Sequence, residues 1–360
     1  MASSRAPVIL ALTIVAGVAI AGGSLLFLGL REPPPVKTDA TAAPSAPTST
    51  PAKAQNPDTP SAAASARPSD PRRIEEILSA ADRFVADGEA NKARVTLAAA
   101  VQSYPTDQSL RIRFARVLGS LQQHAEAHEQ YEKALAIGPR SPTIEFEAGT
   151  MANAAGRLER ALEHYAAAQT LDPANADYPL YLGVMQHKLK QNDEAKASLM
   201  RSAKLRPDAP AAWGVLAEIA MEENKPTIAR QHISRARELE PKATAWRMIE
   251  ARVLNRLGKP DDALGVIAGI PDAERRTLAV ARLEGESLGM LRRVSDAAAV
   301  FVQASEARPE DPDLALEAAT WLERAGDTTK AKAYAARAVM LGNPAAEAVK
   351  KRLDAATESK

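Results

Sequence analysis

The sequence predicts an all-α solenoid of about eight helical hairpins, preceded by one transmembrane helix and a disordered linker. Three observations predict this architecture: an uncharged N-terminal run, a proline-rich segment after it, and small residues that recur every 34 positions over the rest of the chain. A period of this length is typical of stacked helix–turn–helix units. A short tail, residues 1–7, precedes the uncharged run.

Residues 8–30, from Val8 to Leu30, contain no charged side chain. A helix of this length crosses a hydrocarbon core of about 30 Å, and it exceeds the roughly 7–15 apolar residues of a typical signal peptide. We therefore expect an uncleaved transmembrane anchor, with a cleaved signal peptide as the alternative. Arg5 on one side of the run and Arg31 with Lys37 on the other nearly balance, so the positive-inside rule leaves the orientation open.

Residues 31–71 hold ten of the chain's 25 prolines among alanine, serine and threonine, with no aromatic residue. Such a composition buries too little apolar area to offset the chain entropy that folding removes. We expect a disordered linker. A short tail, a single span and a stalk of this kind resemble bacterial membrane-anchored proteins whose repeats face the periplasm. We therefore expect an inner-membrane protein in this orientation, with the opposite orientation as the alternative.

The rest of the chain carries small residues at fixed phases of the 34-residue period. One phase is occupied by alanine eight times, and another small residue lies twelve positions before each of these alanines. A larger apolar residue usually lies four positions after the alanine, and a proline often lies twelve positions after it. The alanines are Ala93, Ala127, Ala161, Ala195, Ala229, Ala263, Ala297 and Ala331. The preceding small residues are Ala81, Ala115, Gly149, Gly183, Ala217, Ala251, Gly285 and Ala319.

These columns predict two helices in each repeat. Small residues let the two helices cross with their backbones close together, and the larger side chain fills the neighbouring gap. Proline ends the second helix. Turn residues such as Gly88-Glu89 separate the helices, and Asp193 or Asp261 is placed to cap the helix that follows. One hairpin cannot bury its apolar face alone, so neighbouring hairpins stack.

The sixth repeat departs from the pattern. Its second helix, residues 262–270, is interrupted by Gly265 and followed by Pro271. Ala297 restores the phase. We expect a shortened helix at this point and no domain break.

The period and its columns resemble the tetratricopeptide repeat family, in a membrane-anchored bacterial form. The resemblance covers eight repeats of 34 residues over residues 74–345. It implies a right-handed superhelical solenoid in which the first helix of each repeat lines a concave groove, and it implies a binding scaffold. The charged residues 346–360 are expected to form a C-terminal capping helix whose polar outer face closes the stack.

Composition excludes several classes of function. The 46 basic and 45 acidic residues nearly cancel, which argues against a nucleic-acid partner. The absence of cysteine excludes disulfides, thiolate metal sites and cysteine nucleophiles. No phosphate-binding, dinucleotide-binding or nucleophile-elbow motif is present. We therefore expect no enzyme, no catalytic residue, no cofactor and no small-molecule substrate.

The histidines carry the strongest metal-like signal. His124 and His128 lie four residues apart, so on a helix they share one face and could chelate zinc. No third ligand is evident in the sequence, because His164, His187 and His232 fall in separate repeats. We therefore expect no metal site.

The resemblance places the groove-facing side chains at the second, fifth, ninth and twelfth positions of each repeat, counted from residues such as Gln108 and Leu278. These positions hold a mixture of apolar, amide and charged side chains, Arg282 and Glu286 among them. Such a surface suits an extended or helical peptide, because amides bond its backbone and methionine accepts its apolar side chains. The partner-binding residues predicted from the sequence are Arg116, Asn153, His187, Met221, Arg252 and Asn255.

Two functions fit these observations. The first is a membrane-tethered protein–protein interaction scaffold that binds a peptide or partner protein in the concave groove, in envelope assembly or biogenesis. The alternative is an accessory, substrate-recruiting subunit of a membrane enzyme system, such as polysaccharide synthesis or cytochrome maturation. Both bind a protein partner, and in neither does this chain catalyse a reaction.

Overall fold

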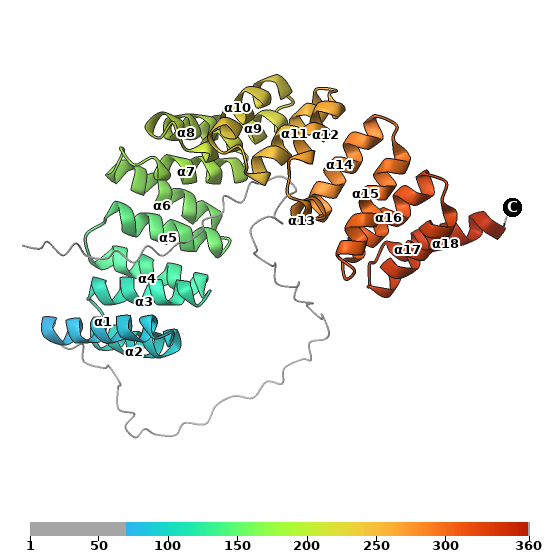
Figure 1. Cartoon of the computed structure of the whole chain (residues 1–360). Coiled ribbons are helices and arrows are strands. Elements are labelled where there is room, and N and C mark those ends of the chain that lie inside the picture. The colour runs from blue at the N-terminus through green and yellow to red at the C-terminus, as the bar shows by residue number, and fades with distance from the viewer. Residues whose placement is uncertain (1–69, 359–360) are drawn as a thin grey trace, which may run out of the picture. The chain divides into compact units, whose positions relative to one another are not determined.

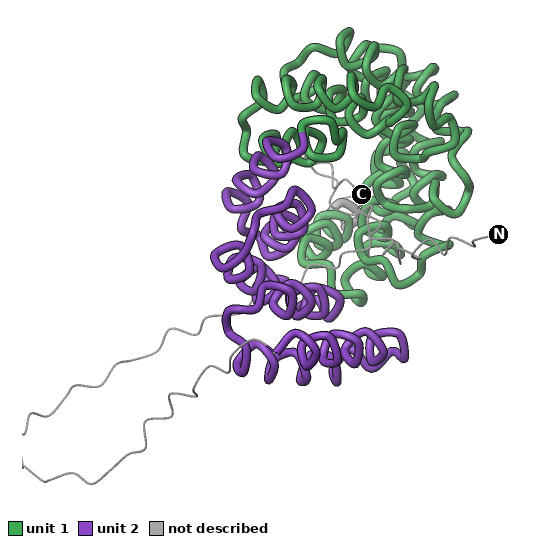
Figure 2. The backbone as a smooth tube through the Cα atoms, turned by 90° about the vertical axis from the view of Figure 1, so that its left-hand side faces the viewer, with its two compact units in different colours: residues 1–28, 173–360 green, residues 29–172 purple. Residues whose placement is uncertain are grey.

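The computed structural model describes residues 70–358, and this part of the chain is built of eighteen α-helices with no strand (Figure 1). The predicted tail, the predicted anchor at residues 8–30 and residues 31–69 of the predicted linker lie outside the described residues. Among the helices described, none has both the length and the apolar character that a membrane span requires. The described residues divide into two compact units, 70–172 and 173–358 (Figure 2).

The unit at residues 70–172 contains three helical hairpins, and each contacts the next. In every hairpin we call the first helix A and the second helix B. The three pairs are α1 (Pro71–Ala86) with α2 (Ala90–Ser103), α3 (Gln108–Ser120) with α4 (His124–Ile137), and α5 (Pro142–Ala154) with α6 (Leu158–Leu171).

The unit at residues 173–358 contains five hairpins, one short helix and a terminal helix. The hairpins are α7 (Asp177–Lys188) with α8 (Asn192–Leu205), α9 (Pro210–Glu222) with α10 (Pro226–Leu239), α11 (Thr244–Arg256) with α12 (Pro260–Ala268), α14 (Leu278–Met290) with α15 (Val294–Ala307), and α16 (Pro312–Arg324) with α17 (Thr328–Met340). The remaining two helices are α13 (Asp272–Arg275) and α18 (Ala346–Glu358).

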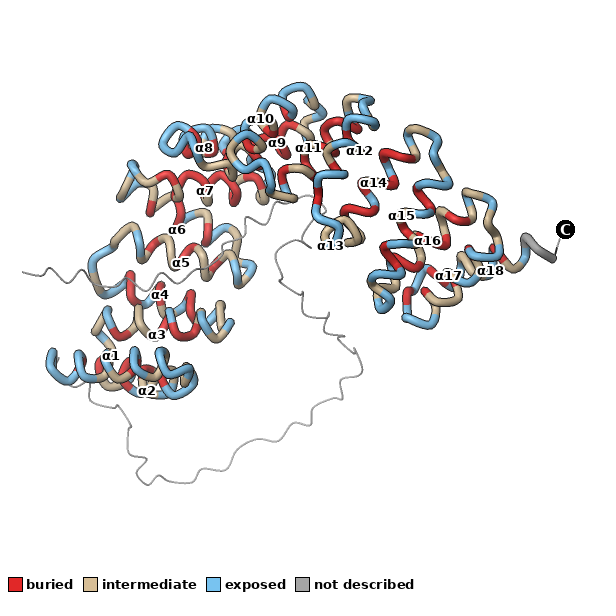
Figure 3. The backbone as a smooth tube through the Cα atoms, viewed as in Figure 1, coloured by how far each residue is buried: buried red, intermediate tan, exposed pale blue. Residues whose placement is uncertain are grey.

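The 34-residue alanine column is the centre of the packing. All eight of its members are completely buried, at 0% exposure, and all lie near the start of a helix B. Buried positions follow the helix faces that meet, and exposed positions gather at the turns and outer faces (Figure 3). The predicted helical repeat is confirmed, because the period of the sequence is the period of the buried contacts.

The small residues that recur in the A helices lie against the larger side chains of the B helices. A Cβ atom built on Gly149 would lie 2.9 Å from the ring of Tyr165, and one built on Gly285 would lie 2.5 Å from the ring of Phe301. Separations this short are far inside van der Waals contact. Glycine at these two positions is therefore required by the large partner, which lies sixteen residues later in each case.

Two positions after the end of every A helix lies a residue with a left-handed backbone, and these residues recur at the 34-residue period. They are Gly88, Gln122, Gly156, Lys190, Asn224, Gly258, Arg292 and Gly326. A left-handed residue after the helix lets the chain reverse within three residues. Four of the eight are not glycine, so the turn keeps the left-handed backbone even where the residue type disfavours this conformation.

The prediction that Asp193 or Asp261 caps a helix was wrong. The N-caps of α8 and α12 are Gln191 and Lys259, which directly follow the left-handed residue, and neither makes a side-chain capping bond. Both aspartates lie in the first helical turn, where a negative charge interacts favourably with the helix dipole.

The sixth hairpin has the shortened B helix that the glycines and proline predict. Helix α12 ends at Ala268, and Ile270 is buried after it, at 3% exposure, before the short α13. At the C-terminal end of this unit, α18 packs on α16 and α17, with Ala346 and Leu353 buried. The unit at 173–358 therefore ends in a helix that covers the last hairpin.

A pair of glycine substitutions tests this packing. Gly183→Ala should lower the free energy of unfolding by about 1–3 kcal/mol, because a methyl group there would lie 2.7 Å from Leu199 Cγ and 3.1 Å from the carbonyl oxygen of Ala195. Gly265→Ala is the matched control, since nothing lies within 4 Å of its Cβ position. It should raise the free energy by up to about 1 kcal/mol through helix propensity. Denaturant unfolding followed by circular dichroism measures both, and equal losses would contradict the assigned crossing.

Candidate functional site

A hollow of about 530 Å³ lies over helices α14, α15 and α16 in the unit at residues 173–358. Its walls come from two successive A helices and the B helix between them. The lining residues are Arg282, Glu286, Gly289, Val294, Phe301, Glu317, Trp321 and Arg324. The hollow therefore combines an aromatic and aliphatic floor with two arginines and two glutamates at its edge.

Trp321 is held in place from three sides. Gly289 lets the indole approach α14, since a Cβ on Gly289 would lie 2.9 Å from Trp321 Cη2. Phe301 stacks on the indole at a centroid distance of 6.0 Å and an interplanar angle of 15°. The guanidinium carbon of Arg324 lies 4.8 Å from the centre of the indole on helix α16. A partner could pack an apolar side chain on this fixed ring and place an acidic or carbonyl group beside the guanidinium of Arg324.

Arg282 and Glu286, which the sequence assigns to the inner face of the repeats, both line this hollow. Arg282 Nε donates to Glu317 Oε1 at 2.7 Å, which links α14 to α16. Trp321 was not predicted, because it occupies the tenth position of its repeat. The signal in the sequence that could have pointed to it is Gly289, thirty-two residues earlier, which leaves the space that the indole fills.

Two of the six predicted groove residues are exposed or half-buried arginines that pair with a neighbouring A helix. Arg116 on α3 makes two hydrogen bonds to the Glu147 carboxylate on α5, each of 3.0 Å. Arg252 on α11 donates to Glu218 Oε1 on α9 at 2.9 Å. Since each arginine already faces a carboxylate, the pair does not form the free positive surface that an acidic peptide requires.

Two other predicted residues are buried. His187 is 1% exposed, with its Nδ1 3.1 Å from Asn192 Oδ1 and its Nε2 3.4 Å from Glu222 Oε1. Asn255 is 5% exposed and accepts a hydrogen bond of 3.0 Å from the Ser287 hydroxyl. Both occupy the twelfth position of a repeat, and this position faces the next A helix. We therefore leave them out of the surface proposed for a partner.

Asn153 and Met221, also at the twelfth position, are half-buried. Met221 packs against the apolar cluster of α9, α10 and α11. The six predicted residues are thus distributed over five A helices, α3, α5, α7, α9 and α11, and the structure does not gather them into one cavity.

The histidine pair that the sequence singles out does not converge. His124 Nε2 lies 2.9 Å from Gln122 Oε1 in the turn, whereas His128 is buried against α6. No pair of metal ligands is formed by these two residues.

Comparison with known proteins identifies the repeats. One tetratricopeptide repeat family model matches residues 112–176 and 216–274, and a second matches residues 152–219. Residues 112–274 carry tetratricopeptide repeats. The phased columns that predict them from the sequence are the columns that the structure buries.

Similar proteins add the fold alone. Mouse (Mus musculus) protein O-mannosyl-transferase TMTC1 is 35% identical over 89 residues, which are 24% of this chain and 9% of that protein. The crystal structure of PilW, a widely conserved type IV pilus biogenesis factor, is 18% identical and has a TM-score of 0.50, covering 59% of this chain and 99% of its own. A tetratricopeptide repeat protein from Parabacteroides merdae is 14% identical with a TM-score of 0.49, covering 78% and 99%.

The repeat that contains α9 holds a carboxyl group whose ionisation is coupled to the stability of the fold. Burial raises the pKa of Glu218 to about 7, and Arg252 offsets only part of this effect. Burial outweighs the ion pair because the Glu218 side chain is 9% exposed, while Arg252 is 36% exposed and still solvated.

The stability of the chain should therefore depend on Glu218 near neutral pH. Because the folded pKa lies above the unfolded value of about 4.3, the folded state holds an extra proton between these two values. The stabilisation by this proton is lost as the pH rises through 7. Between pH 5 and pH 8, wild type should lose up to about 3 kcal/mol of unfolding free energy relative to Glu218→Gln, measured by denaturant titration.

Glu286→Gln serves as the control for this pH dependence, since Glu286 is an exposed carboxyl on α14. It should track wild type at both pH values. A Glu218→Gln variant with the same pH dependence as wild type would show that the buried carboxyl stays ionised throughout.

Proposed function

We propose that this chain is a membrane-tethered scaffold that holds a segment of a partner protein against the A helices of its tetratricopeptide repeats, in bacterial envelope assembly or biogenesis. The repeats, which are shown, support the role of a protein–protein interaction scaffold. The apolar run at residues 8–30 and the proline-rich residues 31–71 support the tether and a position in the inner membrane with the repeats in the periplasm.

The hollow over α14, α15 and α16 is the observation that carries the binding proposal. It is large enough for one or two peptide side chains, and its floor is formed by Phe301, Trp321 and Val294. Buried aromatic residues of this kind supply most of the binding energy at peptide interfaces. The surrounding A-helix surfaces offer ion-paired arginines, which contribute little net attraction.

The charged side chains at the edge of the hollow restrict which peptides can bind there. Arg324 lies over the indole and Arg282 is held by Glu317, so two guanidinium groups border the apolar floor. Glu286 borders the same floor from α14. We infer a segment with one large apolar side chain for the floor, and a carboxylate or exposed carbonyl beside it for Arg324.

Matched tryptophan variants test the binding surface. Peptides selected from a random displayed library on the full-length chain should contain a recurrent aromatic or large aliphatic residue, and Trp321→Ala should weaken their binding at least about tenfold because it removes the anchor. Trp213→Ala is the control, since Trp213 stacks on His232 at 5.8 Å outside the hollow. Equal binding by wild type and Trp321→Ala, measured by fluorescence anisotropy, would place the peptide elsewhere.

The tether and its orientation have a separate test. If residues 8–30 form an uncleaved anchor, a fusion of alkaline phosphatase after Lys360 should be enzymatically active and should remain in the membrane fraction at full length. An inactive phosphatase fusion with a fluorescent GFP counterpart would reverse the orientation. A product shortened by about 21 residues would show that the segment is a cleaved signal peptide.

A further inference from the structure

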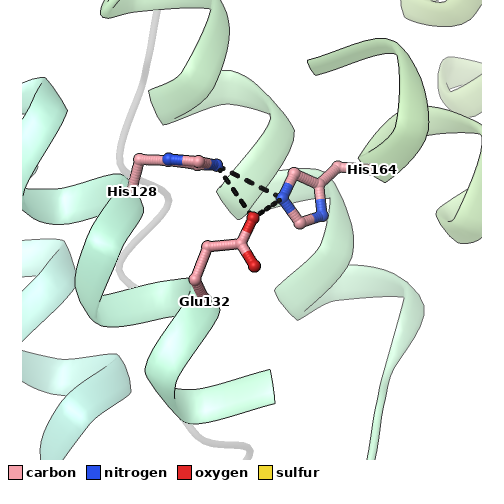
Figure 4. Close-up of side chains that lie close together, drawn as sticks. All are labelled: His128, Glu132 and His164. Atoms are coloured by element: carbon pink, nitrogen blue, oxygen red, sulfur yellow. Dashed lines mark hydrogen bonds and ion pairs between the residues drawn. The ribbon is translucent and has the colours of Figure 1, made fainter. Parts of the chain in front are cut away.

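Two histidines and a glutamate converge between the second and third hairpins. His128 and Glu132 lie one turn apart on α4, and His164 comes from α6 (Figure 4). His128 Nε2 lies 3.3 Å from His164 Nε2 and 3.3 Å from Glu132 Oε1. His164 Nε2 lies 3.0 Å from the same carboxylate oxygen. The three ligand-type atoms therefore form a nearly equilateral triangle.

The size of this triangle matches a zinc site. In a tetrahedral site with zinc–nitrogen and zinc–oxygen bonds of about 2.0–2.2 Å, neighbouring ligand atoms lie about 3.3 Å apart. An ion slightly above the plane of the three atoms would make all three bonds without movement of α4 or α6. Two imidazoles and one carboxylate are also a ligand set that zinc prefers.

The orientation of His164 is fixed by a second carboxylate. His164 Nδ1 lies 2.7 Å from Glu145 Oε2, and the Glu145 side chain is 1% exposed. A protonated Nδ1 that donates to a buried carboxylate leaves the lone pair of Nε2 directed into the cluster. Metal-binding histidines are held by this arrangement.

The acceptor atoms of the cluster need a proton or a cation between them. When Nδ1 of His164 carries the proton, its Nε2 and the Glu132 oxygen are two acceptors 3.0 Å apart. Acceptors at this distance repel unless a proton or a metal ion lies between them. Because Arg157 donates to His128 Nδ1, His128 Nε2 carries a proton that it can donate to either of the other two ligand atoms, each 3.3 Å away, and a zinc ion would take the place of this proton.

Two arginines on the N-terminal side of α6 compete with a metal ion. Arg160 bonds the Glu132 oxygen that faces the cluster, and Arg157 donates to His128 Nδ1 at 2.9 Å. Zinc at Nε2 requires a proton on Nδ1 of His128, so Arg157 must leave this nitrogen. Both arginines have another carboxylate to bind, Glu163 for Arg160 and Glu129 for Arg157. Their side chains are 47% and 37% exposed, so they can withdraw without leaving a buried charge.

We propose that His128, Glu132 and His164 bind one zinc ion, which joins the B helices of the second and third hairpins and keeps a water molecule as its fourth ligand. The histidine side chains are 3% and 7% exposed, whereas Glu132 is 34% exposed, so the ion enters and the water lies on the side of the carboxylate. This site is on the B helices and is separate from the hollow of α14, α15 and α16.

The test is zinc binding by the untagged full-length chain after treatment with a chelator. Wild type should bind one zinc ion per chain in competition with a chromogenic chelator, and cobalt should give the visible absorption of a tetrahedral site. Glu132→Gln and His164→Gln should each weaken zinc binding at least about tenfold and abolish the cobalt spectrum. Arg157→Gln should strengthen zinc binding severalfold, because it removes the competitor for His128 Nδ1.

Two variants control for indirect effects. Glu159→Gln removes an exposed carboxylate of α6 that is not a ligand, and His124→Gln removes the neighbouring histidine of α4. Both should bind zinc as wild type does. If the buried His164→Gln variant does not fold, Glu132→Gln still tests the site, because the Glu132 side chain is more exposed. Zinc binding that is absent from wild type, or equal in wild type and Glu132→Gln, would overturn the proposal.

Discussion

The close crossing of helices A and B is the constraint on which the rest of the structure depends. Each crossing places a fully buried alanine of helix B next to a small residue of helix A, and in seven of the eight hairpins a larger side chain four positions after the alanine fills the remaining space. Because interiors are packed at near-crystalline density, a single added methyl group must displace a neighbour. The arrangement of the two helices within each hairpin follows from this contact.

Polar residues at the A-helix surface are used mainly to join one hairpin to the next. The Arg–Glu pairs link α3 with α5, α9 with α11, and α14 with α16. The twelfth position serves the same purpose, through Gly289 against Trp321 and Asn255 against Ser287. Because these charged side chains already pair with one another, the surface has little free charge. The aromatic hollow is therefore a better candidate for a partner-binding site than the arginines.

On the B helices, the same stacking of hairpins brings histidines and carboxylates together. Stacking at the repeat period places His128 of one B helix beside His164 of the next, although 36 positions separate them in the chain. Glu145 from the intervening A helix then holds His164 from behind. The scaffold therefore offers two independent surfaces, an apolar hollow on the A side and a nitrogen–oxygen cluster on the B side.

The sequence by itself determined the helical repeat, its 34-residue phase, the buried columns and the shortened sixth B helix, because each depends on residue size and local backbone preference at a fixed spacing. It did not determine the sites. His187 and Asn255 were assigned to the groove, Trp321 was passed over, and His164 was set aside as an isolated residue. Whether a side chain faces solvent, a neighbouring helix or a cluster depends on the rotation between stacked hairpins. That rotation is decided by packing between helices of different hairpins, so only the tertiary structure contains it.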